Sequence, residues 1–108
     1  MPKGAYLGEF EQHVMAALLR LRNNAYGVTI RREIMERTGR DVAVGAIYAT
    51  LDRLEAKGYV SSRLGESTPE RGGRAKRFFR IEAPGERALG EAYRMSDQMR
   101  TGLAPVGA

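Results

Sequence analysis

The sequence predicts a mainly helical α+β domain with a small two-stranded wing, and three observations lead to this fold class. In Ala43–Tyr59, apolar residues recur at helical spacing, while the other side of the helix carries small residues. Two strand-like runs follow, Tyr59–Leu64 and Lys76–Ile81, and a stretch rich in Gly, Pro and Arg separates them. A helix, a strand, a long basic loop and a second strand form, in this order, the recognition helix and wing of a winged helix-turn-helix.

Charge and composition favour a nucleic-acid partner. The 108 residues include 18 Lys and Arg against 13 Asp and Glu, and the resulting net charge of +5 favours a polyanion. Fifteen of the basic residues are Arg, which suits bidentate contacts to phosphate and guanine. The absence of cysteine excludes disulfides, zinc fingers and thiol chemistry. No apolar run approaches the ~20 residues of a membrane span, and no signal peptide is apparent, so we expect a cytoplasmic protein.

The first helix is expected over Leu7–Leu21, after a loose arm of residues 1–6. Its apolar residues keep helical spacing: Leu7, Phe10, Val14, Leu18 and Leu21. His13 lies just off this stripe. A single His without Cys or a second His makes a poor metal site, so we expect His13 at the surface or an interface. We expect neither a metal nor a cofactor.

The second helix is expected to follow Asn23-Asn24, whose side chains can cap its first turn. Its apolar stripe is Tyr26, Ile30 and Ile34. Thr38-Gly39 ends the helix, and the chain then turns toward the recognition helix.

Two arginines on the outer side of the second helix, Arg31 and Arg32, leave two interpretations open. They are either solvated charges balanced by Glu33 and Glu36, or phosphate contacts beside a DNA groove. Arg40 lies in the turn that follows.

The third helix is the candidate recognition helix. Ile47, Leu51 and Leu54 form its core stripe, and Gly58 ends it because glycine enters the left-handed cap without steric cost. The opposite face carries Gly45, Ala46, Ala49, Asp52, Arg53 and Ala56. This face either lets the backbone approach another surface closely or is an ordinary Ala-rich surface. Tyr48 lies on the flank, about 100° from Ile47, at the core edge or with its hydroxyl toward DNA.

Basic side chains cluster in the wing with no acid among them: Arg71, Arg74, Lys76, Arg77 and Arg80. Gly72-Gly73 lets the tip adopt positive φ angles and fit against a groove. We interpret the cluster as phosphate contacts, and the alternative is a solvated loop. Phe78 and Phe79 point to opposite faces of a strand. One ring must therefore enter the core, and the other can cover a second surface such as the last helix.

The last helix begins around Pro84, which is well placed in a first turn. A heptad-like seam runs along it, widened by Leu89 and Tyr93: Ala88, Ala92, Met95 and Met99. Such a seam outside a complete winged-helix core favours a partner helix, although the helix could also fold back over its own domain. The predicted organisation is a DNA-binding domain (1–82), a dimerisation helix (83–101) and a flexible tail (102–108).

Four stretches resemble the PadR family of transcriptional regulators: LGEFEQHVMAALLRL, NAYGVTIRREI, VGAIYATLDRLEAKGYV and ERGGRAKRFFRI. The resemblance runs from about Leu7 to Leu89, and its most specific part joins Tyr48–Gly58 to Arg71–Arg80. One departure is Ala49, where the family often has proline. This departure affects only the start and aim of the recognition helix.

The resemblance implies a regulator that binds double-stranded DNA, a repressor acting as a homodimer on a palindromic operator. In the family, a tyrosine at the place of Tyr48 packs at the protein–DNA boundary, and the last helix forms the dimer with the first helix. Here the last helix is about four turns long, similar to the short-tailed members. The DNA-contacting candidates are Gly45, Ala46, Tyr48, Ala49, Thr50, Arg53, Arg71, Gly73, Arg74, Lys76 and Arg77. The dimer-interface candidates are Leu7, Phe10, Val14, Ala88, Ala92, Met95 and Met99.

Two other classes of function are alternatives to DNA binding. A winged-helix module that binds protein or structured RNA would keep the fold but would not prefer a palindromic site. An enzyme is disfavoured because the chain offers no Ser/His/Asp set, no metal cluster and no paired carboxylates in a Gly-rich pocket.

A small hydrophobic effector is a further candidate partner. Family members sense phenolic acids or hydrophobic drugs near the dimer interface, but this chain has no Trp to clamp a flat aromatic ligand. Phe10, Tyr93, Met95 and Met99 either line an apolar space for such an effector or are packed core.

Overall fold

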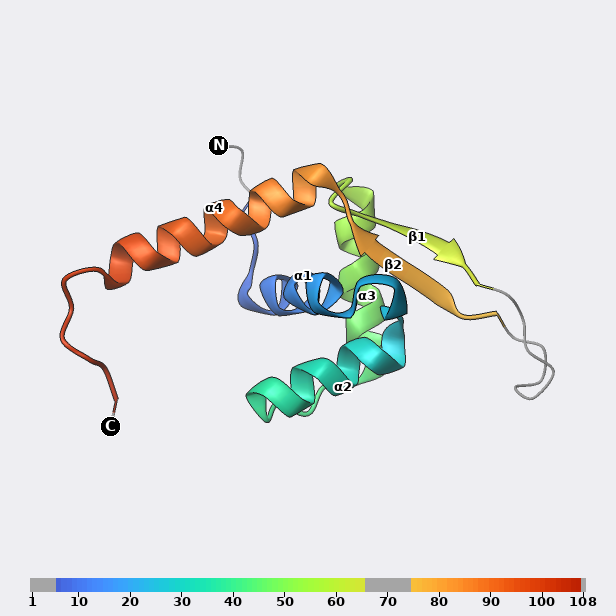
Figure 1. Cartoon of the computed structure of the whole chain (residues 1–108), viewed down its shortest axis with the longest axis horizontal. Helices are drawn as coiled ribbons and strands as arrows, with labels where there is room; N and C mark the ends of the chain where they lie inside the picture. The colour runs from blue at the N-terminus through green and yellow to red at the C-terminus, as the bar shows by residue number, and fades with distance from the viewer. Residues whose placement is uncertain (1–5, 66–74, 108) are drawn as a thin grey trace.

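The computed structural model describes residues 6–65 and 75–107, and it confirms the predicted α+β winged-helix fold (Figure 1). The elements are α1 (Glu9–Leu21), the 3₁₀ helix η1 (Arg22–Asn24), α2 (Gly27–Thr38), α3 (Val44–Ala56), β1 (Val60–Leu64), β2 (Arg77–Ile81) and α4 (Ala83–Arg100). Three helices pack together, the two antiparallel strands extend from them as the wing, and α4 follows β2. The arm at residues 1–5 and the predicted wing tip lie outside the described residues.

The core lies between α1, α2, α3 and one face of the sheet. The predicted stripe of α3 is confirmed, because Ile47, Leu51 and Leu54 are all fully buried. Ile30 and Ile34 of α2 face them and are also buried. Each such side chain contributes roughly 1.5–3 kcal/mol on burial. The stripe therefore fixes the rotation of α3 and leaves its small-residue face outward.

More of the surface of helix α1 is buried than its predicted apolar stripe. Val14 and Leu18 of that stripe are buried, and so are Met15 and Ala17 beside it. Leu7, just before the helix, also belongs to the core. The prediction of Leu7 and Val14 as dimer-interface residues is therefore wrong, because the core of the chain itself already covers them.

The start of α2 also differs from the prediction. Asn23 and Asn24 belong to η1, and the N-cap residue of α2 is Tyr26, whose side chain makes no capping hydrogen bond. Instead, the buried hydroxyl of Thr29 accepts a hydrogen bond from the backbone N–H of Tyr26 at 3.0 Å. The same hydroxyl donates to the carbonyl oxygen of Asn24 at 2.6 Å. Thr29 thus fixes the turn into α2 from inside the helix.

Helices α2 and α3 end at glycines, as predicted. Gly39 has φ 74°, and its N–H donates to the carbonyl oxygen of Met35 at 2.9 Å. Gly58 has φ 77°, and the next residue, Tyr59, donates to the carbonyl oxygen of Leu54 at 3.0 Å. These bonds satisfy carbonyls at the helix ends that would otherwise lack partners.

The two faces of the wing have different surroundings because side chains alternate along a strand. Phe79 points to the inner face, toward α3, and is buried, as predicted for one of the two rings. Phe78 points to the outer face, where it does not cover α4 but lies edge-on to Tyr26, with ring centroids 5.4 Å apart. The backbone N–H of Phe79 donates to the carbonyl oxygen of Ala25 at 2.9 Å, which ties the wing to the segment before α2.

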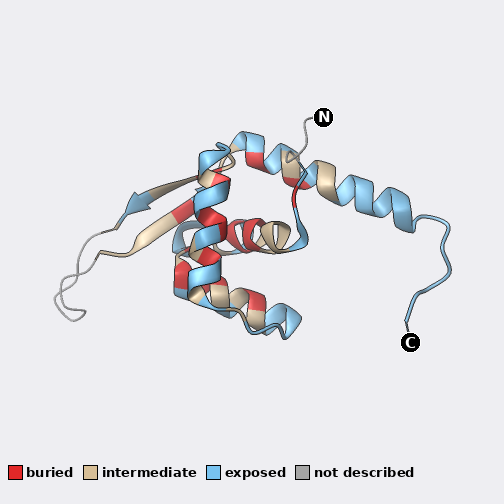
Figure 2. Ribbon diagram, turned by 180° about the vertical axis from the view of Figure 1, so that it is seen from behind, coloured by how far each residue is buried: buried red, intermediate tan, exposed pale blue. Residues whose placement is uncertain are grey.

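Helix α4 leaves the rest of the molecule after its first turns (Figures 1 and 2). A Cβ on Gly85 would lie only 2.2 Å from the carbonyl oxygen of Tyr59, and Leu89 is buried, so the start of the helix is firmly seated. From Tyr93 to its end every residue is exposed, so the helix does not fold back over its domain. Its 18 residues make about five turns, one more than predicted.

Among the residues described, no helix is both long and apolar enough to cross a membrane.

Candidate nucleic-acid interface

The outward face of α3 is exposed and carries small residues. All six residues predicted for this face are exposed: Gly45, Ala46, Ala49, Asp52, Arg53 and Ala56. A Cβ placed on Gly45 would meet no atom within 4 Å, so the space beside it is open. The major groove of B-DNA admits an α-helix, and short side chains let the helix backbone approach the base edges. The position of this face agrees with the predicted DNA-facing side, and the contact itself stays a prediction.

Thr50 does not belong to this face. It is 2% exposed, and its Oγ1 accepts a hydrogen bond from Nη2 of Arg53 at 3.1 Å. The prediction that Thr50 contacts DNA is therefore wrong. The sequence contained the signal, because Thr50 follows Ile47 by three residues and so lies on the core stripe. Its hydroxyl holds Arg53, which stays exposed.

Tyr48 lies between the two positions considered for it. Its ring packs at the core edge, 6.2 Å from the ring of Phe79 between centroids. Its hydroxyl lies against the first residue of α2, only 2.6 Å from where a Cβ on Gly27 would be. Any larger residue at position 27 would displace Tyr48, so Gly27 sets how closely α2 and α3 approach.

Lys76 is held over an aromatic ring at the base of the wing. Its Nζ lies 4.4 Å from the centroid of the Tyr26 ring and donates to the Tyr26 hydroxyl at 3.3 Å. Tyr26 was predicted only as a core residue, so its contact with Lys76 was missed. A Lys and a Tyr 50 residues apart in the chain are brought together only by the return of the wing toward α2.

Arg77 is bound to α3 and is not free. Its Nη1 lies 3.2 Å from Asp52 Oδ1, its Nη2 lies 2.6 Å from Glu55 Oε1, and its guanidinium stacks over the Phe79 ring at 4.8 Å. Glu55 also accepts a hydrogen bond from the Ser62 hydroxyl at 2.8 Å. The prediction of Arg77 as a phosphate contact is not supported by this geometry, because two carboxylates of α3 already balance its charge.

The other predicted wing contacts divide into two groups. Arg71, Gly73 and Arg74 lie outside the described residues. Arg80 is described and points to the outer face of the sheet, where its Nε lies 2.8 Å from Glu82 Oε2.

The two arginines on α2 have different surroundings. Arg31 braces the turn between α2 and α3, because its Nε donates to the carbonyl oxygen of Val42 and its Nη2 pairs with Asp41, both at 2.8 Å. Its partners are therefore not Glu33 or Glu36. Arg32 is exposed, and no carboxylate of the described segments lies within 4.0 Å of it.

Most of the remaining dimer-interface candidates lie along α4. Ala88 and Ala92 are half-buried, whereas Met95 and Met99 are exposed. Phe10 of α1 is partly covered by the guanidinium of Arg40, 5.2 Å from the ring centroid. Met95 and Met99 are therefore not packed in the core of the described chain.

His13 lies on α1 with its Nε2 3.9 Å from Oε1 of Glu9. Within residues 6–65 and 75–107, no group of His, Asp and Glu side chains is arranged to hold a metal ion.

Comparison with known proteins identifies a family of regulators. Residues 15–91 match the model of the transcriptional regulator PadR-like family. No curated protein sequence matches the chain.

Several solved structures share the fold. A PadR-like transcription factor from Bacteroides fragilis is 24% identical, with a TM-score of 0.72 over 84% of this chain and 82% of that one. A PadR family regulator from Eggerthella lenta is 24% identical, with a TM-score of 0.67 over 87% and 81% of the two chains. A PadR family regulator from Clostridium difficile is 19% identical, with a TM-score of 0.67 over 86% and 95%.

Proposed function

The chain belongs to the PadR-like family of transcriptional regulators, and from this we propose that it acts as a homodimeric repressor on a palindromic operator. The family consists of DNA-binding regulators and not of enzymes. The proposed parts are the dimer, the symmetry of the operator, the sense of regulation and the residues that touch DNA.

The observation that carries the DNA-contact proposal is the exposed small face of α3. Gly45, Ala46 and Ala49 lie in the first half of the helix, where recognition helices place their base-contacting residues. Their size would let the helix sit deep in a major groove. Arg53, farther along the same face, supplies a donor suited to guanine.

Phosphate contacts would come from the cations beside this face. Lys76 at the base of the wing and exposed Arg32 on α2 are the described candidates, and Arg71, Gly73 and Arg74 are proposed from the sequence alone. Cations that neutralise phosphates release counterions, so they would contribute affinity that does not depend on sequence and that falls with salt. Arg77 would contribute less to phosphate binding than these cations, because it is paired with Asp52 and Glu55.

The dimer proposal is supported by the outer part of α4. Tyr93, Met95 and Met99 are exposed on a helix that projects from the domain, and large apolar side chains in such a position are typical of an interface. Two domains related by a two-fold axis would place two copies of α3 in major grooves about one helical turn apart, roughly 34–36 Å. Occupation of such a site within a promoter would block transcription.

An effector site would require the second chain. A hollow of about 430 Å³ lies between α1 and α4, and its described lining is mainly polar: Gln12, Tyr93, Ser96, Asp97 and Arg100. Of the apolar residues predicted to line an effector space, only Tyr93 borders this hollow. A small hydrophobic effector therefore remains a proposal that depends on the dimer.

Selection of bound duplexes from a random DNA pool tests the proposal directly. We expect the chain to enrich an inverted repeat, with half-sites one helical turn apart, and the Ala49→Glu variant to enrich no motif. Enrichment of a single half-site would contradict the dimer on DNA. Enrichment of no motif by the wild type, together with tight binding to a structured RNA pool, would contradict operator recognition.

A further inference from the structure

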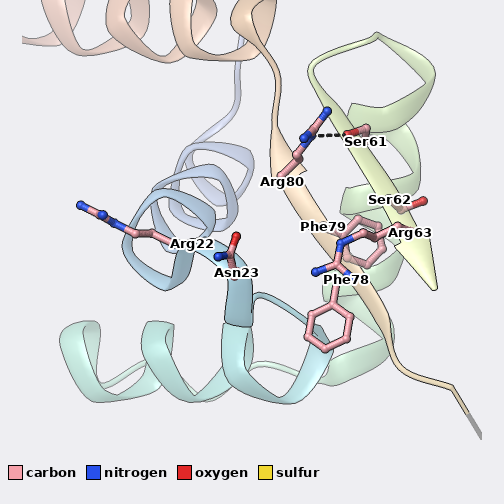
Figure 3. Close-up of a pocket in the computed structure, with 8 residues that line it drawn as sticks. All are labelled: Arg22, Asn23, Ser61, Ser62, Arg63, Phe78, Phe79 and Arg80. Carbon is pink, nitrogen blue, oxygen red and sulfur yellow. Dashed lines mark hydrogen bonds between the residues drawn. The ribbon is translucent and has the colours of Figure 1, made fainter. Parts of the chain in front are cut away.

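A hollow of about 270 Å³ opens between η1 and the outer face of the wing (Figure 3). The outer face is the one that points away from α3, since Phe79 on the inner face packs in the core. The residues that line the hollow include Arg22, Asn23, Ser61, Arg63, Phe78 and Arg80. Of these residues, only Phe78 and Arg80 are singled out from the sequence, and Arg80 belongs there to the basic cluster interpreted as phosphate contacts.

Positive charge dominates the hollow. The guanidinium of Arg63 lies over the Phe78 ring, 4.9 Å from its centroid, and no carboxylate of the described residues lies within 4.0 Å of it. Glu82 is the acid beside the hollow, and its Oε2 already accepts hydrogen bonds from Ser61 at 2.7 Å and Arg80 at 2.8 Å. The Ser61 hydrogen bond, followed by that of Arg80, lowers the pKa of Glu82, so this carboxylate stays ionised and committed to these donors. Arg63 keeps its charge available.

The wall formed by η1 shows backbone strain. Arg22 has φ 52°, in the left-handed region that a residue with a side chain seldom adopts. Strain of this kind concentrates at functional sites. The Arg22 guanidinium points away from the sheet in Figure 3, so Arg22 adds charge at the rim, while Asn23 next to it supplies an amide donor to the hollow.

Size and shape decide the class of ligand. The Phe78 ring is covered by Arg63 and packs against the Tyr26 ring, so it is not free to stack on an aromatic ligand. The volume lies just below the ~300–1,000 Å³ of typical drug-sized sites. Guanidinium groups bind oxyanions through paired N–H donors.

We propose that this hollow binds a compact oxyanion of the phosphate type, held chiefly by Arg63, with Asn23 and the Nη groups of Arg80, whose Nε pairs with Glu82, as further donors. Phosphate can be free in solution or part of a nucleic-acid backbone. We assign the free anion, because the hollow faces away from the α3 surface proposed to meet DNA. The proposal does not depend on DNA binding, because the anion can be titrated without DNA.

Nuclear magnetic resonance can detect the anion at this site. Sodium phosphate is titrated into the isotopically labelled chain, with sodium chloride at equal ionic strength as the reference. We expect the Asn23 side-chain amide and the Nε–H groups of Arg63 and Arg80 to shift and saturate with phosphate only. Shifts centred on Arg53 would overturn the proposal, because phosphate would then favour the DNA-facing side.

Two charge-matched variants separate a built site from general attraction. The Arg63→Gln/Arg80→Gln variant should lose the saturable response, and Arg87→Gln/Arg100→Gln, altered on exposed α4 positions, should keep it. Equal responses in both variants would overturn the proposal. If the first variant does not fold, Arg63→Lys/Arg80→Lys keeps the charge without the paired donors. We then expect at least tenfold weaker binding, and unchanged binding would overturn the proposal.

A duplex of random sequence distinguishes the two sources of phosphate. Binding of this duplex, and its dependence on salt, should be equal in the two Gln variants if the hollow takes a free anion. A selective loss of duplex binding in Arg63→Gln/Arg80→Gln, without any response to free phosphate in the wild type, would assign these arginines to the nucleic-acid backbone and overturn the proposal.

Discussion

Helices α3 and α4 both carry an apolar stripe at helical spacing, but they bury it to different extents. In α3 the stripe of Ile47, Leu51 and Leu54 is fully buried within the chain. In the apolar stripe of α4 only Leu89 is buried, and Met95 and Met99 lie 39% and 79% exposed. The difference shows that periodicity alone predicts a helix and its apolar side, but not what covers that side. For α3 the cover is α1 and α2, and for the outer part of α4 we propose a second copy of the chain.

The largest expected difference between the two helices is in stability. Leu51→Ala should lower the free energy of unfolding by about 2–5 kcal/mol, because it leaves a cavity in the core. Met99→Ala should change it by no more than about 0.5 kcal/mol in a dilute, monomeric sample. Urea unfolding at two protein concentrations measures both. A large effect of Met99→Ala that persists at low concentration would show that α4 is covered within the chain.

The next prediction concerns assembly through α4. Ala92→Asp should put a charge in the seam and convert the dimer to a monomer, with weaker DNA binding because one half-site is lost. Gly90→Asp carries the same charge change at an exposed position with open space around it, and it should remain dimeric. Sedimentation at micromolar concentration measures the oligomeric state of both variants and of the wild type. A monomeric wild type, or a dimeric Ala92→Asp variant, would remove α4 from the interface.

The outward face of α3 gives the third prediction. Ala49→Glu adds bulk and negative charge opposite the buried stripe, so it should leave thermal stability nearly unchanged. Specific DNA affinity should fall by an order of magnitude or more, in line with the ~1–3 kcal/mol cost of one mismatched contact. A gel-shift with the selected duplex measures the loss, with Gly90→Asp as the charge-matched control. Normal binding by Ala49→Glu would mean that another face of α3 meets DNA.

The smallest effect should distinguish the two cations at the base of the wing. Lys76→Gln should reduce the dependence of log affinity on log salt by about one unit, as expected when one phosphate contact is lost. Arg77→Gln should leave this slope nearly unchanged, because Arg77 pairs with Asp52 and Glu55. The same ion pairs, partly exposed, should be worth at most about 1 kcal/mol to folding. A larger change of slope in Arg77→Gln than in Lys76→Gln would show that DNA displaces the two acids.

Short-range pattern predicted most of the fold. The stripes of α1, α2 and α3, the glycine ends at Gly39 and Gly58, and the two strands all follow from rules that span a few residues. The start of α2 was missed because Asn23 and Asn24 were read as caps, whereas the buried Thr29 hydroxyl satisfies the local backbone groups instead. Capping propensity does not predict which of several nearby polar side chains will form these hydrogen bonds.

The candidate site was less predictable, because its contacts join distant parts of the chain. Arg77 was read as free because no acid is near it in sequence, yet Asp52 and Glu55 reach it across the turn from α3 into the wing. The pairing of Lys76 with Tyr26 spans half the chain in the same way. Thr50 is a different case. Its spacing places it on the buried side of α3, and this position outweighs the polar chemistry that predicts a DNA contact.

The junction between β2 and α4 bears on the spacing of the proposed operator. Strand β2 ends at Ile81 and α4 begins at Ala83, so only Glu82 separates them, and its N–H is fixed to the carbonyl oxygen of Tyr59 at 2.9 Å. The direction of α4 is therefore set by the sheet, because no flexible linker separates β2 from α4. In a dimer built on α4, the separation and relative rotation of the two recognition helices would be set rigidly by this junction. Each inserted base pair rotates one half-site relative to the other, so such a protein would tolerate little variation in operator spacer length.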